Sequence, residues 1–298
     1  MRQMLKRLVA PRSHGLIVSI GGASDIVIAR AMALTAAECG AAEVDIAQTF
    51  AVDDLSGKKI VGEAIREFAL VPVEGVPANL ALRHAAQVEN TKKEPKDRGK
   101  GKRISAALSL PVGQRFVVAG TAGIWSLLCR RPWTDTGPYD FIVGVDGGGD
   151  VLGIDKDCDV KVLGALSAGI PPTCAYRLAV VGPGADGTDI LDIATAHMPG
   201  WAREAEIVLS EDFAVKLEEG LRQASCWLED VRTWGPDNPE WNYDLKVPQI
   251  ISLAIRDAAP FGFTAEGHIL FPRRGKLRGM RADWLRSAWL FSRNSEAR

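Results

Sequence analysis

Residues 141–150 read FIVGVDGGGD, an apolar run that passes directly into three glycines enclosed by two aspartates. Two more apolar runs end in a similar way. LIVSI at 16–20 leads into GGASD at 21–25, and LAVV at 178–181 leads into GPGADGTD at 182–189. Glycine is needed where the backbone adopts positive φ or approaches a ligand closely. Ligands of parallel sheets bind beyond the carboxyl ends of the strands, so we expect the three loops to converge on one site.

Along the chain, apolar runs alternate with segments of helical period. This predicts an α/β fold, a Rossmann-like three-layer sandwich with a mostly parallel central sheet. Strands are expected over 15–20, 42–49, 115–119, 140–145, 177–181, 206–209 and 267–271. Helices are expected over 25–39, 59–70, 79–88, 160–167, 188–197, 211–233, 247–258 and 278–291. The length of 298 residues fits one α/β domain over 1–298, with a C-terminal helical layer from about residue 210.

The segment at 91–103, TKKEPKDRGKGKR, holds seven basic and two acidic residues and almost no apolar ones. Because it has no apolar face to bury, we expect a mobile surface loop. A lid that brings Lys or Arg to an anionic substrate is the second interpretation.

The composition narrows the classes of function. Hydrophobic content is 47% and charged content 24%, which is ordinary for a globular protein, and the net charge of −1 favours neither nucleic acid nor a membrane surface. No apolar stretch approaches the roughly 18 residues of a membrane helix. The five cysteines form no CxxC pair, which argues against a zinc site. We expect a cytoplasmic protein with a small-molecule substrate, and homo-oligomerisation stays open.

The second loop carries the strongest chemical signal. Asp146 and Asp150 bracket the glycines Gly147, Gly148 and Gly149, and two carboxylates on a glycine arch can hold Mg²⁺. That ion prefers carboxylates together with waters and substrate phosphate oxygens. A tight turn with solvated aspartates is the alternative interpretation.

The first and third loops allow two interpretations each. Gly21 and Gly22 precede a helix whose free N–H groups attract anions, whereas Asp25 suits a metal, a ribose hydroxyl or a helix cap. The glycines of the third loop can form an anion nest or a simple strand-to-helix turn that Thr188 or Asp189 caps.

GVDGGGD at 144–150 and GPGADG at 182–187, preceded by GGASD at 21–25, resemble in the same order the motifs of an uncharacterised family, domain of unknown function 1152. The resemblance covers the motif regions between about residues 15 and 200. It implies a soluble α/β protein and names no reaction. The chain departs from the pattern at Thr188, where we expect an acidic residue, and over 153–167, which lacks a Glu and a Ser-Pro-Leu run.

The loops together favour an enzyme, a transferase or hydrolase, that acts on a phosphorylated or nucleotide-like molecule by Mg²⁺-dependent phosphoryl or nucleotidyl chemistry. Asp146 and Asp150 would hold the metal, and Asp25 or Asp186 would act as a base or further ligand. The expected ligand-binding residues are Gly21, Gly22, Gly147, Gly148, Gly149, Gly182, Gly184, Gly187 and Thr188. Two alternatives remain: a metal-independent Rossmann-type enzyme that binds NAD or S-adenosylmethionine, and a non-catalytic nucleotide-binding protein.

Overall fold

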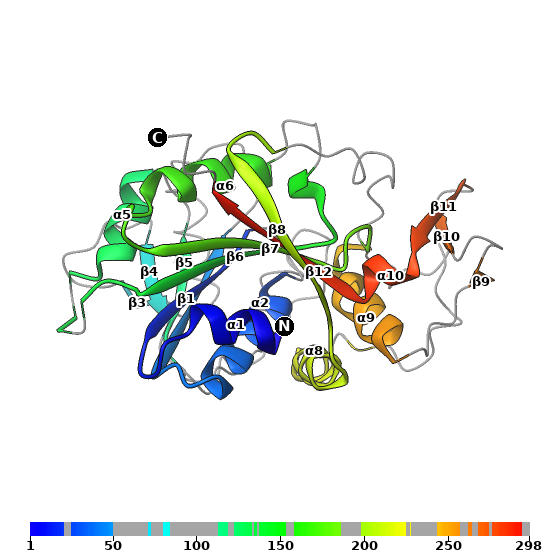
Figure 1. Cartoon of the computed structure of the whole chain (residues 1–298), viewed down its shortest axis with the longest axis horizontal. Helices are drawn as coiled ribbons and strands as arrows, with labels where there is room; N and C mark the ends of the chain where they lie inside the picture. The colour runs from blue at the N-terminus through cyan, green and yellow to red at the C-terminus, as the bar shows by residue number, and fades with distance from the viewer. Residues whose placement is uncertain are drawn as a thin grey trace.

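A nine-stranded sheet crosses the molecule in the computed structural model (Figure 1). The structure describes residues 1–20, 25–49, 71–72, 80–83, 113–118, 122–132, 134–135, 137–152, 158–185, 198–224, 227, 243–256, 262–263, 268–273 and 276–293. The strand order is β3-β4-β5-β2-β1-β6-β7-β12-β8. Their bounds are β1 His14–Ser19, β2 Glu43–Thr49, β3 Val71–Pro72, β4 Leu80–Arg83, β5 Arg115–Val118, β6 Phe141–Gly147, β7 Ala175–Val181, β8 Trp201–Val208 and β12 Ser287–Arg293.

The five strands in the middle of the sheet, β5, β2, β1, β6 and β7, are parallel. The chain starts at β1 in the centre, adds β2 and β5 on one side, and then adds β6 and β7 on the other. This is the doubly wound order, and it confirms the predicted α/β fold with a mostly parallel sheet.

Helices cover both faces of the sheet, as the three-layer prediction requires (Figure 1). One layer holds α1 (Arg2–Leu8), α2 (Asp25–Glu38), α8 (Glu211–Gln223) and α9 (Tyr243–Ile255), and the other holds α5 (Ala122–Arg130) and α6 (Cys158–Gly169). Alternate side chains of β1 serve the two layers: Ile17 packs with α2, whereas Leu16 and Val18 pack with α5 and α6. A strand buried on both faces reads as the unbroken apolar run seen in the sequence.

The C-terminal part corrects the expected helical layer. α8 and α9 are helices, but the expected helix over 278–291 is wrong: β11 (Lys276–Arg281), the short α10 (Ala282–Leu285) and β12 replace it. β12 lies antiparallel between β7 and β8. Its side chains alternate between the two cores, Leu290 in one and Trp289 in the other, and periodicity cannot distinguish such a buried run from a helix.

Beyond the central sheet, β11 pairs with β10 (His268–Arg273), which pairs with β9 (Gly262–Phe263), in a second antiparallel sheet. In the expected helix over 79–88, residues 80–83 form strand β4 instead, antiparallel to β5. The expected helices over 59–70 and 188–197 and the basic segment 91–103 lie outside the described residues.

None of the described helices has the length and apolar character needed to cross a membrane.

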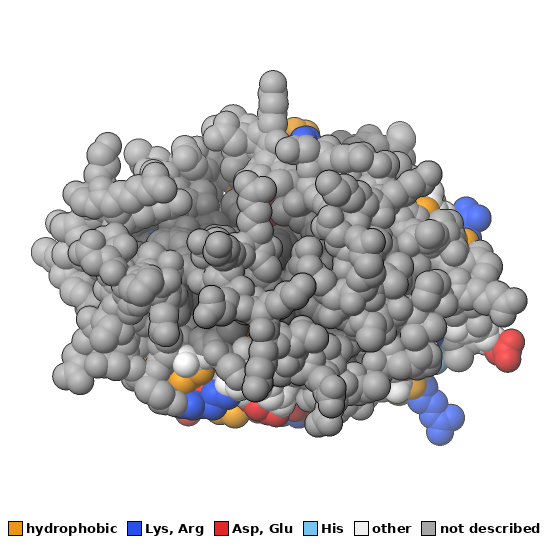
Figure 2. Space-filling model, turned by 180° about the vertical axis from the view of Figure 1, so that it is seen from behind, with side chains coloured by type: hydrophobic (Ala, Val, Ile, Leu, Met, Phe, Trp, Pro, Cys, Tyr) orange, Lys and Arg blue, Asp and Glu red, His pale blue; other side chains and the backbone are white. Residues whose placement is uncertain are grey.

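Figure 2 shows the molecule from behind. The side chains that the structure describes are visible on this face mainly along its lower rim, where basic and acidic groups lie close together.

Candidate functional site

The three strands that precede the glycine loops are neighbours and run in the same direction. β1 pairs with β6 in a register that sets Ser19 opposite Val145, and β6 pairs with β7 so that Gly147 lies opposite Val181. All three strands therefore end at one edge of the sheet, which is the strand arrangement that the expected convergence of the loops requires. The strand order also reverses between β1 and β6, and in doubly wound sheets the crevice at this switch point binds the ligand.

Hydrogen bonds join the second loop to the third. The Gly148 N–H donates to Val181 O at 3.0 Å, and the Gly184 N–H donates to Gly148 O at 2.5 Å. Gly148 and Gly184 both have positive φ, 101° and 89°, a region that disfavours other residues. The described parts of the two loops, 147–149 and 182–185, are therefore buried and hydrogen-bonded to each other at the ends of β6 and β7.

These contacts limit which amides can hold a phosphate. The N–H groups of Gly148 and Gly184 already donate to carbonyls, and the Gly182 N–H donates to Ser287 O at 2.9 Å. Each N–H has one hydrogen to donate, so these three amides are occupied by the fold. Of the expected ligand-binding residues, Gly21, Gly22, Gly187 and Thr188 lie outside the described residues.

Two buried carboxylates lie at this edge. Asp146 is fully buried, and Asp25, the first residue of α2, is only 5% exposed. A Cβ placed on Gly147 would lie 2.7 Å from Asp25 Oδ1, so the Asp25 carboxylate packs against the end of β6. Side chains alternate along a strand, which directs Asp146 to the opposite face from Gly147. The structure therefore brings Asp25 and Asp146 to the two sides of one strand end.

The metal assignment remains a prediction. Asp150 opens the short 3₁₀ helix η1 (Asp150–Leu152), directly beyond the glycines, but its side chain and all of Asp186 lie outside the described part. Among the described side chains, no group of three or more His, Cys, Asp or Glu is placed to hold a metal ion. Mg²⁺ commonly uses one or two carboxylates, with waters and phosphate oxygens as its other ligands. The donor chemistry at the edge therefore suits this ion.

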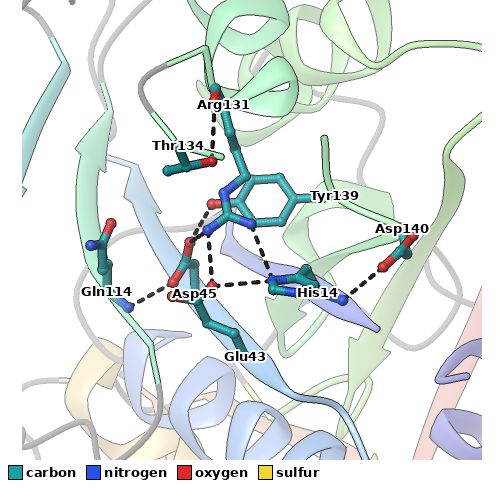
Figure 3. Close-up of polar contacts among 8 residues, drawn as sticks. All are labelled: His14, Glu43, Asp45, Gln114, Arg131, Thr134, Tyr139 and Asp140. Atoms are coloured by element: carbon teal, nitrogen blue, oxygen red, sulfur yellow. Dashed lines mark hydrogen bonds and ion pairs between the residues drawn. The ribbon is translucent and has the colours of Figure 1, made fainter. Parts of the chain in front are cut away.

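A second polar cluster, which the sequence did not predict, lies at the opposite edge of the sheet (Figure 3). Arg131, just after α5, places Nη2 2.9 Å from Glu43 Oε2, and its guanidinium lies 4.7 Å from the centre of the Tyr139 ring. The Tyr139 hydroxyl donates to Asp45 Oδ2 at 2.5 Å. His14 Nδ1 lies 3.2 Å from Glu43 Oε2 and 3.3 Å from Arg131 Nη1.

Burial and charge shift the acids of this cluster in opposite directions. Burial acts to raise the pKa of Glu43, but hydrogen bonds and charge from Arg131 and His14 outweigh it, so the pKa is lowered. For Asp45, burial dominates over the hydrogen bonds from Tyr139 and the Gln114 amide, and the pKa is raised. Burial and the neighbouring Asp45 also raise the pKa of Tyr139 well above its usual value.

The position of this cluster indicates a structural role. His14 begins β1, Glu43 begins β2, and Asp140 precedes β6, where it accepts a hydrogen bond from the His14 N–H at 2.8 Å. The cluster thus joins the amino ends of three parallel strands, away from the edge where ligands of such sheets bind. The sequence signal that could have found it is the pair of acids Glu43 and Asp45 within the predicted strand at 42–49.

Comparison with known proteins supports no assignment of a function. No family model matches the chain, and no curated protein matches it. Among solved structures, it is similar to a DUF574 family protein from Streptomyces avermitilis MA-4680, at 9% identity and a TM-score of 0.28, over 98% of this chain and 80% of that one.

Proposed function

We propose that this chain is an enzyme that binds a nucleotide-like small molecule at the carboxyl edge of the sheet, where β1 and β6 adjoin. One observation carries the proposal: the buried carboxylates Asp25 and Asp146 flank the end of β6 at the point where the strand order reverses. Carboxylates at this position can bind a ribose hydroxyl or a cation of a bound nucleotide.

The reaction class that fits best is Mg²⁺-dependent phosphoryl or nucleotidyl transfer, or the related hydrolysis. Asp146 and Asp150 would hold the ion, which would offset the negative charge of the phosphates. Asp25 would orient a hydroxyl of the substrate or accept its proton. Of the three glycines, Gly149 would allow the closest approach of the substrate, since Gly147 packs against α2 and Gly148 bonds to the third loop.

A second candidate is a metal-independent enzyme that binds NAD or S-adenosylmethionine. The amides of Gly148, Gly182 and Gly184 donate to carbonyls and so add nothing to a phosphate cradle, which favours S-adenosylmethionine within this class because it carries no phosphate. In this reading the carboxylates at the edge bind ribose hydroxyls and no metal.

Thermal unfolding in the presence of nucleotides, NAD and S-adenosylmethionine, each with Mg²⁺ or EDTA, tests the proposal. A ligand that binds only the folded state at 100 times its Kd adds about 2.7 kcal/mol of stability. Stabilisation by nucleoside phosphates that requires Mg²⁺ supports the first candidate, and stabilisation that persists in EDTA supports the second. If none of these ligands raises the melting temperature, the proposal is wrong. Stabilisation without turnover of the bound ligand would indicate a non-catalytic nucleotide-binding protein.

A matched pair of variants locates the site. Asp146→Asn keeps the shape of the side chain and removes its charge, and we expect it to abolish stabilisation by the ligand. Asp135→Asn makes the same change at an exposed position before β6 and should leave binding unchanged. Full ligand binding by folded Asp146→Asn would reject this site.

A further inference from the structure

Gln48 is a buried polar residue at the same edge of the sheet. It is the penultimate residue of β2, it is 2% exposed, and its side-chain oxygen accepts no hydrogen bond from any residue that the structure describes. An unpaired buried polar atom destabilises a fold and calls for a functional or structural reason. Two buried hydroxyls in the helices of the same layer do have hydrogen bonds: Thr35 donates to Ala31 O at 2.8 Å, and Ser252 donates to Ala214 O at 3.3 Å.

The register places Gln48 beside the candidate site. It lies between Ser19 of β1 and Val117 of β5, close to where these strands end. Because side chains alternate along a strand, Gln48 lies on the same face of β2 as Val44 and Ile46, which pack in the core that includes α2. Gln48 and Asp25 therefore lie on the same side of the sheet and at the same edge.

We infer that Gln48 is a ligand-binding residue that hydrogen-bonds a ribose hydroxyl of the nucleotide-like ligand, an inference that rests on the proposed function. In doubly wound folds that bind dinucleotides, an acidic residue roughly 20 residues beyond the glycine turn accepts a hydrogen bond from the ribose 2′-hydroxyl. In this chain an amide stands at the end of the strand after the first glycine loop. Its carbonyl accepts a hydrogen bond from a hydroxyl, and its NH₂ group donates to a hydroxyl oxygen. The ligand class is thus a ribonucleotide, distinguished from its 2′-deoxy form.

The polar cluster around Arg131 at the amino edge is a weaker candidate for binding a ligand. In the Arg131 cluster, Arg131 Nε and Gln114 Oε1 also make no hydrogen bond with the described residues. These atoms lie at the amino edge, within a cluster whose charges already pair with one another.

The test compares Gln48→Leu with the wild-type protein in thermal unfolding, using the four ribonucleoside triphosphates and their 2′-deoxy forms, with Mg²⁺. We expect the wild-type protein to be stabilised more by at least one ribonucleotide than by its deoxy form. Gln48→Leu, of similar volume, should melt at the same or a higher temperature without ligand, because it removes an unpaired polar atom. Its affinity for the ribonucleotide should fall about tenfold, to that for the deoxy form.

Two further variants sharpen the result. Gln48→Glu keeps an acceptor and should retain the preference for ribose. Gln223→Leu makes the same change on the outer face of α8, where the Gln223 amide donates to Glu219 Oε1, and should leave the preference unchanged.

The outcomes separate the two proposals. If no nucleotide stabilises the wild-type protein, the proposed function fails and this inference fails with it. If the wild-type protein is stabilised equally by both sugar forms, or if Gln48→Leu retains the ribose preference, only the role of Gln48 is rejected. A lower melting temperature of unliganded Gln48→Leu with unchanged binding would show that Gln48 is purely structural.

Discussion

The carboxylate of Asp25 and the bare α-carbon of Gly147 are in such close contact that a methyl group cannot fit between them. A Cβ at position 147 would lie 2.7 Å from Asp25 Oδ1 and 2.6 Å from Ile28 Cδ1. The glycine is therefore required for packing between β6 and α2, separately from any contact with a ligand.

Gly147→Ala should lower the free energy of unfolding by about 1–3 kcal/mol, because the added methyl overfills a packed region. It should also displace Asp25 and weaken ligand binding. Chemical denaturation measures the first effect. Gly164→Ala is the control: a Cβ at this position in α6 meets no atom within 4 Å, and the change should stabilise the helix by about 0.5–1 kcal/mol. Equal effects of the two substitutions would contradict the packing argument.

Removing the buried cation at the amino edge should be costly. Arg131 is 2% exposed and pairs with Glu43 and with the fully buried Asp45. Arg131→Ala leaves these acids without their cation and should cost about 3–5 kcal/mol of stability. Arg2→Ala breaks an exposed pair with Glu38 and should cost at most about 1 kcal/mol. A loss at Arg131 as small as that at Arg2 would show that the cluster adds little to stability.

The stability that ionised Glu43 contributes to the fold should be lost in acid. Its pKa is lowered in the folded state, although burial alone would raise it, because Arg131 and His14 favour the charged form. Its contribution is therefore present above the ordinary Glu pKa of about 4.3 and is lost as pH falls through the folded-state value. Asp45 acts in the opposite direction, because its pKa is raised by burial.

We expect Glu43→Gln to narrow the difference in unfolding free energy between pH 6 and pH 3, measured with urea at each pH. Glu206→Gln, at an exposed position on β8, should leave that difference unchanged. Parallel pH profiles for the wild-type protein and Glu43→Gln would exclude Glu43 as the source.

Ser210 caps α8, as expected for a serine directly before Glu211 and Asp212 at a helix start. Its hydroxyl oxygen accepts a hydrogen bond from the Phe213 N–H at 3.4 Å. Ser210→Ala should cost about 0.5–2 kcal/mol, and Ser210→Asp should keep most of that stability. Loss of equal size in both variants would argue against capping as the cause.

The sequence was most informative where a strand is buried on both faces. The apolar runs that end at Ile20, Val145 and Val181 predicted three parallel strands, and these strands pair as neighbours. The same property misled at 287–293, because Ala288, Trp289, Leu290 and Phe291 form an apolar run that suits either a helix or a doubly buried strand. Only the pairing with β7 and β8 distinguishes the two.

The sequence also predicted some of the polar residues that the fold brings together and missed others. The position of Asp25 and Asp146 at one edge of the sheet was predicted, because each follows an apolar run and stands next to or near glycines. That Gly148 and Gly184 use their amides on carbonyls depends on the contact between two loops, which no local pattern contains. The Arg131 cluster was missed because its members come one or two at a time from separate segments, and their proximity arises only from the fold.

The place of β12 determines when the sheet is completed during synthesis. In the described sheet β8 adjoins β12 alone, and β12 separates it from β7. Residues 201–208 therefore leave the ribosome long before their partner at 287–293, and until then β7 has an unpaired edge. Exposed strand edges of this kind attract other chains and favour aggregation. This interval makes the nascent chain a candidate substrate for chaperones, and mutations that slow the docking of β12 should lower the yield of folded protein more than its final stability.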